Sequence, residues 1–173
     1  AARAAQLLGE GKEVLVVTFN ITLLHYLMDV AVRWPNAHGM TRQGITWLNF
    51  HAWCKRVCEE SDRENEYRDL WKGSEGQAHQ VLSTQLPTLV ASCIEADVEE
   101  IIQRYDAVLV DEGQDFRGSW WEVVEAALSD PKNGILFIFH DDNQALLPFR
   151  SKYPIDDAPF SLSRNCRNAG AVF

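Results

Sequence analysis

The chain has 173 residues, of which 46% are hydrophobic and 24% charged, a composition typical of a globular domain with one hydrophobic core. It carries 16 Lys and Arg against 25 Asp and Glu, so its formal net charge at pH 7 is −9 with His neutral. This acidic balance excludes a protein that wraps nucleic acid in a broad basic surface, but not an enzyme with a local binding groove. Because no run of about 18 apolar residues occurs, we predict no membrane span.

Both the first residues and the cysteines indicate a cytoplasmic protein. Residues 1–8 are rich in Ala, contain one Arg and lack an initiator Met, unlike a secretory signal, so we expect this start to lie inside a longer protein. The spacing of the cysteines resembles no disulfide framework, which favours reduced thiols. They are Cys54, Cys58, Cys93 and Cys166.

Apolar, β-branched runs alternate along the chain with stretches of helical periodicity, and this alternation predicts an α/β fold with a parallel sheet covered on both faces. We predict helices at 1–8, 21–34, 50–58 and 120–128 and a mostly helical stretch at 77–104. We predict strands at 14–19, 45–48, 107–110, 135–139 and 160–162, and a polar loop or loosely held insert at 59–76.

Polar clusters come directly after three of the predicted strands. They are residues 18–20, 111–115 and 141–144. In parallel sheets, ligands bind beyond the carboxyl ends of the strands. We therefore expect these three clusters to meet at one edge of the sheet and to form the functional site.

The strand at 107–110 runs into two adjacent carboxylates, Asp111 and Glu112. A phosphate-bound Mg²⁺ uses one or two protein carboxylates, and a neighbouring acid can orient or deprotonate an attacking water. We predict that Asp111 holds the metal and that Glu112 acts on the water. Two acids alone would fit a solvated loop equally well, whereas the longer string Asp-Glu-Gly-Gln-Asp-Phe is more specific.

That string, residues 111–116, resembles the Walker B motif, DExQD, of superfamily 1 helicases of the UvrD/Rep type. Four other segments resemble motifs of that family, in the same order along the chain. They are 14–20, ending in Thr-Phe-Asn; 45–53, with Phe50-His51; 135–150, with His140-Asp141-Asp142-Asn143-Gln144 and Phe149-Arg150; and 162–167, Leu-Ser-Arg-Asn-Cys-Arg.

The resemblance implies that residues 1–173 are part of a three-layer RecA-like P-loop NTPase domain, incomplete at its N-terminal edge, with a small helical insert at 59–104. It implies an ATP-dependent DNA helicase or translocase that couples ATP hydrolysis to movement on single-stranded DNA. ATP and Mg²⁺ would be its cofactors. The implied roles are Mg²⁺ ligand for Asp111, catalytic base for Glu112, γ-phosphate sensor for Gln144 and transition-state arginine for Arg167.

On the DNA side, the resemblance implies that Phe149 stacks on a base and that Thr18, Phe19 and His51 lie at DNA-contacting positions. The implied partners are single-stranded DNA or a single-strand/duplex junction, and the remaining helicase lobe of the parent chain. Gln114 and Asp115 look like residues that relay the ATP site to neighbouring motifs.

The chain also departs from the family pattern. It contains no G-x-x-x-x-G-K-[ST] phosphate loop, so we expect the isolated chain to hydrolyse ATP negligibly. His140 stands where the family has Gly, and Cys166 stands where it has an aromatic residue. The segment at 59–104 is short for the family's helical insert.

Two other functions stay open. One is a non-catalytic, helicase-like module that binds DNA or protein. A phosphate loop encoded upstream of Ala1 would favour the enzyme, and its lack would favour this module. The other is a metal-dependent nuclease that uses Asp111, Glu112, Asp141 and Asp142.

Two smaller features have alternative interpretations. His51, Cys54 and Cys58 have helical spacing and, with Cys93, would suit zinc, but we favour thiols packed in the core. For the Trp120-Trp121 pair we favour one buried ring and one at an edge over a binding platform, because neighbours on a helix do not share a face.

Overall fold

A computed structural model describes residues 1–34, 41–72, 76–141, 152–156 and 158–161. Its centre is a four-stranded sheet with the order β2-β1-β3-β4, in which every pair of neighbours is parallel. The strands are β1 (Val14–Thr18), β2 (Ile45–Asn49), β3 (Ala107–Asp111) and β4 (Ile135–Ile138). The predicted α/β class and parallel sheet are confirmed.

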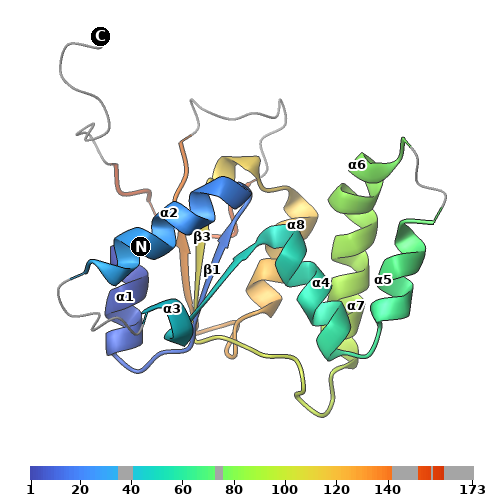
Figure 1. The fold of residues 1–173 in the computed structure, drawn as a ribbon, viewed down its shortest axis with the longest axis horizontal. Helices are drawn as coiled ribbons and strands as arrows, with labels where there is room; N and C mark the ends of the chain where they lie inside the picture. Colours follow the sequence, from blue (N-terminus) through green and yellow to red (C-terminus); the bar gives the residue numbers. More distant parts are fainter. Residues whose placement is uncertain (35–40, 73–75, 142–151, 157, 162–173) are drawn as a thin grey trace, which may run out of the picture.

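Helices connect the strands and cover both faces of the sheet (Figure 1). They are α1 (Ala2–Gly9), α2 (Ile21–Val32), α3 (Thr41–Gly44), α4 (Phe50–Glu60), α5 (Glu64–Leu70), α6 (Ala78–Gln80), the π-helical turn η1 (Val81–Gln85), α7 (Leu86–Ala96), the short 3-10 turn η2 (Gly113–Asp115) and α8 (Gly118–Ala126). No helix in the described part of the chain is both long and apolar enough to cross a bilayer.

Side chains of each strand alternate between the two faces of the sheet, as the two-residue period of a strand requires. In β1, Val14 and Val16 pack against α1 and α2, and we call this side the α1–α2 face. Leu15 and Val17 pack on the opposite side, against α4, α7 and α8, and we call it the α4–α8 face. The sheet therefore lies between two helical layers (Figure 1).

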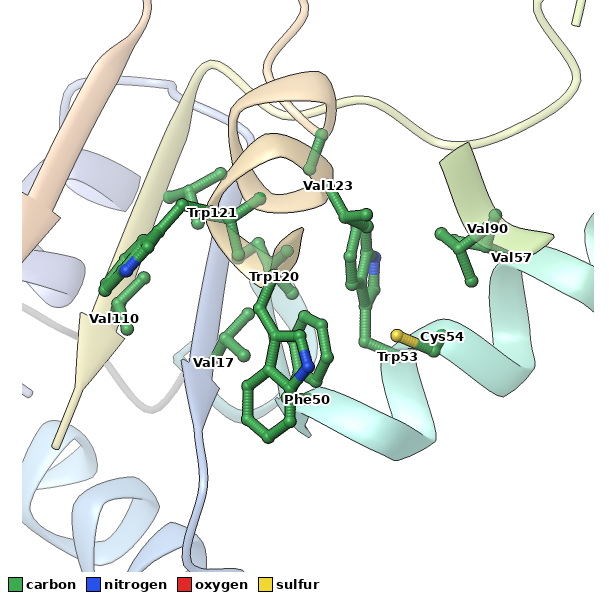
Figure 2. Close-up of a cluster of buried hydrophobic side chains, with 14 of the residues drawn as sticks. Val17, Phe50, Trp53, Cys54, Val57, Val90, Val110, Trp120, Trp121 and Val123 are labelled. Atoms are coloured by element: carbon green, nitrogen blue, oxygen red, sulfur yellow. The ribbon is translucent and has the colours of Figure 1, made fainter. Parts of the chain in front are cut away.

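The α4–α8 face carries the larger buried cluster, and aromatic rings dominate it. Figure 2 shows Phe50 and Trp53 of α4 beside Trp120, Trp121 and Val123 of α8. The predicted segment 59–104 contributes α7 to this same cluster. Its buried members there are Leu86, Leu89, Val90 and Cys93. That 59–104 forms an insert stays a prediction.

Asparagine caps turn two strands directly into helices. Asn20 follows β1, and its Oδ1 accepts a hydrogen bond of 2.9 Å from the backbone N–H of Thr22. Asn49 ends β2, and its Oδ1 accepts one of 3.0 Å from the N–H of Ala52. Such caps satisfy backbone donors that the first helical turn leaves unpaired. They begin α2 and α4 at the carboxyl edge of the sheet.

Two local predictions were wrong. Segment 59–76, predicted as a loop or a loosely held insert, is not a loop throughout, because it contains α5. None of the residues of α5 is fully buried, but Tyr67 and Leu70 pack against the cluster of the α4–α8 face. The ion pairs Arg68–Glu64 at 2.7 Å and Arg63–Glu66 at 2.6 Å support this surface helix. The strand expected at 160–162 is not formed at Phe160 and Ser161, which are irregular and exposed, and Leu162 lies outside the described residues.

Candidate functional site

Strand register brings the predicted polar residues to one edge of the sheet. Thr18, at the end of β1, pairs with Asp111 of β3 on one side and with Asn49 of β2 on the other. The next strand continues this edge, because the N–H of Phe139 donates to the carbonyl of Val110 at 2.8 Å. The ends of all four strands therefore form one continuous border, which we call the carboxyl edge (Figure 1).

The loop after β3 has an unusual backbone at Glu112. Its φ of 55° and ψ of 44° are left-handed, a conformation that costs a residue with a side chain on the order of 1 kcal/mol or more. The turn sends the chain from β3 into η2 and keeps the carboxylate of Glu112 next to that of Asp111 in sequence. Strain of this kind is concentrated at functional sites in proteins.

Gln114 holds this loop in place through both the nitrogen and the oxygen of its side-chain amide. Its Nε2 donates to Oε2 of Glu112 at 2.6 Å, and its Oε1 accepts from the backbone N–H of Asp141 at 3.0 Å. The side chain is buried. Gln114 therefore connects the Glu112 carboxylate to the segment that follows β4, which is a positioning role.

Gly113 is required by the close approach of β4. A Cβ added at this position would lie 2.6 Å from Cγ2 of Ile138 and 3.4 Å from the carbonyl oxygen of Phe139. The N–H of Gly113 also donates to that carbonyl at 2.9 Å. The glycine thus allows the loop after β3 to pack directly on the end of β4.

The start of α1 lies near Asp111. The negative charge of Asp111 acts at Ala1, so the two residues are close. The carboxylate of Asp111 offers an oxygen ligand that suits Mg²⁺. Among the described residues, no three His, Cys, Asp or Glu side chains form a metal-binding group.

A cluster of rings lies beside these acids, on the α4–α8 face. We call it the edge aromatic cluster, and it consists of Phe19, Phe50, His51, Phe116 and Trp120. Trp120 is stacked on both Phe50, at 4.5 Å between centroids, and Phe19, at 6.0 Å. Figure 2 shows the Phe50–Trp120 stack. Phe19 and His51 are partly exposed, whereas Phe50, Phe116 and Trp120 are buried. Phe19 and His51 are therefore the members that a ligand can reach.

His51 is kept neutral by its surroundings. Burial lowers its pKa, and a hydrogen bond to the backbone of Leu82 only partly offsets this. Its Nε2 is buried and has no hydrogen-bond partner. Because the other ring nitrogen donates to the Leu82 backbone, Nε2 of the neutral ring carries no hydrogen and can only accept a hydrogen bond.

The π-helical turn η1 supports the aromatic cluster from outside. The carbonyl of Ser83 accepts hydrogen bonds from Trp120 Nε1 and from Ser119 Oγ, both at 3.3 Å. Leu82 of the same turn bonds to His51. A π turn widens the helix and leaves carbonyls available to side chains, which explains why three side chains converge on it.

The structure therefore brings together part of the predicted site. Thr18, Asp111 and Glu112 lie at the carboxyl edge, and Phe19 and His51 lie in the edge aromatic cluster. Three residues predicted for the helicase site lie outside the described residues, and so does Asp142, one of the four nuclease acids. The three helicase-site residues are Gln144, Phe149 and Arg167.

Sequence reasoning missed Trp120 as a partner of Phe19, since nothing in the sequence links residues so far apart. The prediction that one ring of the Trp120-Trp121 pair is buried and the other lies at an edge was wrong, because both rings are buried. Trp121 packs on Phe116 at 5.0 Å and on Tyr153 at 5.8 Å, so the second side of α8 is covered too.

The cysteines fit the core interpretation. Cys54, Cys58 and Cys93 are all buried in the cluster of the α4–α8 face and are reduced. Together with His51 they form no metal-binding group among the residues the structure describes.

No protein-family model matches the chain, and no curated protein is significantly similar to it in sequence.

Proposed function

We propose that the chain is the ATP-binding region of a superfamily 1 DNA helicase or translocase of the UvrD/Rep type, with a RecA-like fold. The observation that carries the proposal is the register of β1, β3 and β4. It sets Asp111 and Glu112 beside Thr18 and beside the segment after β4, where the resemblance expects a single nucleotide site. Parallel α/β sheets bind ligands at this same edge.

The chemistry follows from the residues at that edge. Asp111 would hold the Mg²⁺ of Mg–ATP, directly or through water. When bound, Mg²⁺ neutralises charge on the phosphate oxygens. Glu112, held by Gln114 at 2.6 Å, orients or deprotonates the attacking water. Gln144 and Arg167 would contact the transferring phosphoryl group.

The DNA side adjoins the nucleotide side through β1. Thr18 pairs with Asp111, and the next residue, Phe19, belongs to the edge aromatic cluster. A nucleic-acid base stacked on the exposed part of Phe19 would be supported by Trp120 behind it. Stacking tolerates any base, as movement along DNA requires. A shift in the end of β1 would be transmitted to both ligands.

Titration of a fluorescent oligothymidylate with the purified chain tests the DNA side. We expect salt-sensitive binding that Phe19→Ala weakens by about 1–3 kcal/mol for each base lost from the stack. Tyr26→Ala is the matched control, because Tyr26 is an exposed ring on α2, at the other face of the sheet. Equal loss in the two variants, or no binding at all, would remove the DNA assignment.

Calorimetry with ATP and Mg²⁺ tests the nucleotide side. We expect Asp111→Asn to abolish the Mg²⁺ dependence of ATP binding, and Glu122→Gln, at an exposed acid of α8, to preserve it. Hydrolysis by the isolated chain should be negligible, because no phosphate-loop sequence occurs in its 173 residues. Robust DNA-stimulated turnover would contradict this last expectation.

The alternative is a helicase-like module that binds DNA or protein without catalysis, and the lack of a phosphate loop upstream of Ala1 would favour it. DNA binding with no Mg²⁺-dependent ATP binding, in the chain and in any longer form that its gene encodes, would select this alternative. Cleavage of DNA with Mg²⁺ or Mn²⁺ that Asp111→Ala abolishes would instead select the nuclease.

A further inference from the structure

Two free cysteines lie where α4 packs against α7. Cys58 lies in the last turns of α4 and Cys93 lies in α7, and they are 0% and 1% exposed. The two thiols share a hydrogen bond, so their sulfur atoms are neighbours. Cys54 lies one turn earlier in α4, in the same buried cluster.

Arg63 distinguishes Cys93 from an ordinary buried thiol. Its Nη1 contacts Sγ of Cys93 at 3.5 Å and Oγ of Ser92 at 2.6 Å. The same guanidinium binds both carboxylate oxygens of Glu66 at 2.6 Å, and the side chains of Arg63 and Glu66 are 27% and 54% exposed. The sulfur of Cys93 therefore lies one side chain below the surface, next to a fixed positive charge.

These contacts favour the thiolate of Cys93. The hydrogen bond from Cys58 lowers the pKa of Cys93 to about 6, with Ser61 and Arg63 acting in the same direction against burial. Burial raises the pKa of Cys54 well above its ordinary value. A thiolate is the reactive form of cysteine, and one beside a second thiol has the arrangement of a redox-sensitive pair.

We propose that Cys58 and Cys93 are an oxidisable dithiol, which a hydroperoxide such as hydrogen peroxide converts into a disulfide joining α4 to α7. The Cys93 thiolate attacks one peroxide oxygen, the O–O bond breaks, and a sulfenic acid and hydroxide form. The sulfur of Cys58 then attacks the sulfenic sulfur, the S–S bond forms, and the departing hydroxide takes the proton of Cys58 as water. The two thiols lose two protons and two electrons in total, and the peroxide becomes two waters.

Peptide mapping can test this pair directly, because trypsin places each cysteine in a different peptide. Cys54 falls in residues 43–55, Cys58 in 57–63, Cys93 in 73–104 and Cys166 in 165–167. The reduced chain is treated with hydrogen peroxide, and the remaining thiols are alkylated with N-ethylmaleimide before digestion. We expect the intact mass to lose two hydrogens, two fewer thiols to be alkylated, and peptides 57–63 and 73–104 to be linked.

Variants separate the steps of the reaction. In Cys58→Ser the disulfide should be lost and the sulfenic acid of Cys93 should be trapped by dimedone, whereas Cys93→Ser should give neither product. Cys54→Ser is the matched control and should still form the Cys58–Cys93 link, and Arg63→Gln should slow it. Linked peptides that contain Cys54 or Cys166, or full alkylation of both Cys58 and Cys93 after peroxide, would overturn the proposal.

Discussion

The two faces of the sheet use different kinds of side chain. The α1–α2 face is filled mainly by Ala, Val, Leu and Ile, and Trp47 is the aromatic member of its buried set in the described chain. The α4–α8 face buries several stacked rings and three cysteines. The rings of this second face continue to the carboxyl edge, where Phe19 is partly exposed. The comparison teaches that the proposed DNA-binding surface is the outer end of a hydrophobic core, so its shape depends on that core.

Among changes that test this difference between the two faces, we expect Trp120→Ala to have the largest effect on stability. The change removes a ring stacked on Phe50 and leaves the carbonyl of Ser83 without its indole donor. We expect the free energy of unfolding to fall by about 3–5 kcal/mol. Leu24→Ala on the α1–α2 face is the counterpart, with an expected loss near the lower end of about 2–5 kcal/mol, since Leu24 lies at the rim of its cluster. Urea unfolding of both variants would measure the difference, and equal losses would show that the two faces contribute alike.

A smaller effect is expected from Gly113→Ala. The new methyl group would lie 2.6 Å from Cγ2 of Ile138, so the loop after β3 must move away from β4. We expect a loss of about 1–3 kcal/mol, typical of overpacking. Gly118→Ala is the control, because a Cβ there meets nothing within 4 Å, and its effect should stay within about 0.5 kcal/mol. Thermal unfolding of the two variants checks the prediction.

The smallest effect is a pH dependence of stability that arises from His51. Its folded pKa is lowered from the ordinary value of 6.5, so the unfolded chain binds the proton more readily than the folded chain. The stability contributed by the neutral ring is complete above pH 6.5, and it is lost as the pH falls below that value toward the folded pKa. We expect urea midpoints to decrease in this window in the parent chain and to decrease less in His51→Gln. An identical profile in the two proteins would show that His51 is not buried in its neutral form.

The sequence predicted the strands well because their signal is local. The run of Val and Leu in β1 and the run of apolar residues in β3 end in polar residues, and the rule for parallel strands then placed Thr18 and Asp111 at the same edge. Side-chain partners were not predictable in this way. The burial of Trp121 depends on Tyr153, which follows it by many residues. In α5 the charged residues outnumber Tyr67 and Leu70, the two that pack on the cluster of the α4–α8 face, so the helical pattern is weak there.

The π turn between α6 and α7 also has a consequence for how this chain tolerates changes in length. A π turn contains one residue more than the α-helical turn it replaces, so a single deletion within Val81–Gln85 would restore regular winding. The carbonyl of Ser83 would then be returned to the helix, and the anchors of Trp120 and Ser119 would be lost. A deletion of one residue in this turn should therefore loosen the packing of Trp120 in α8. A deletion of one residue in the exposed turn at 130–133 would leave the hydrogen bond of Trp120 to Ser83 in place.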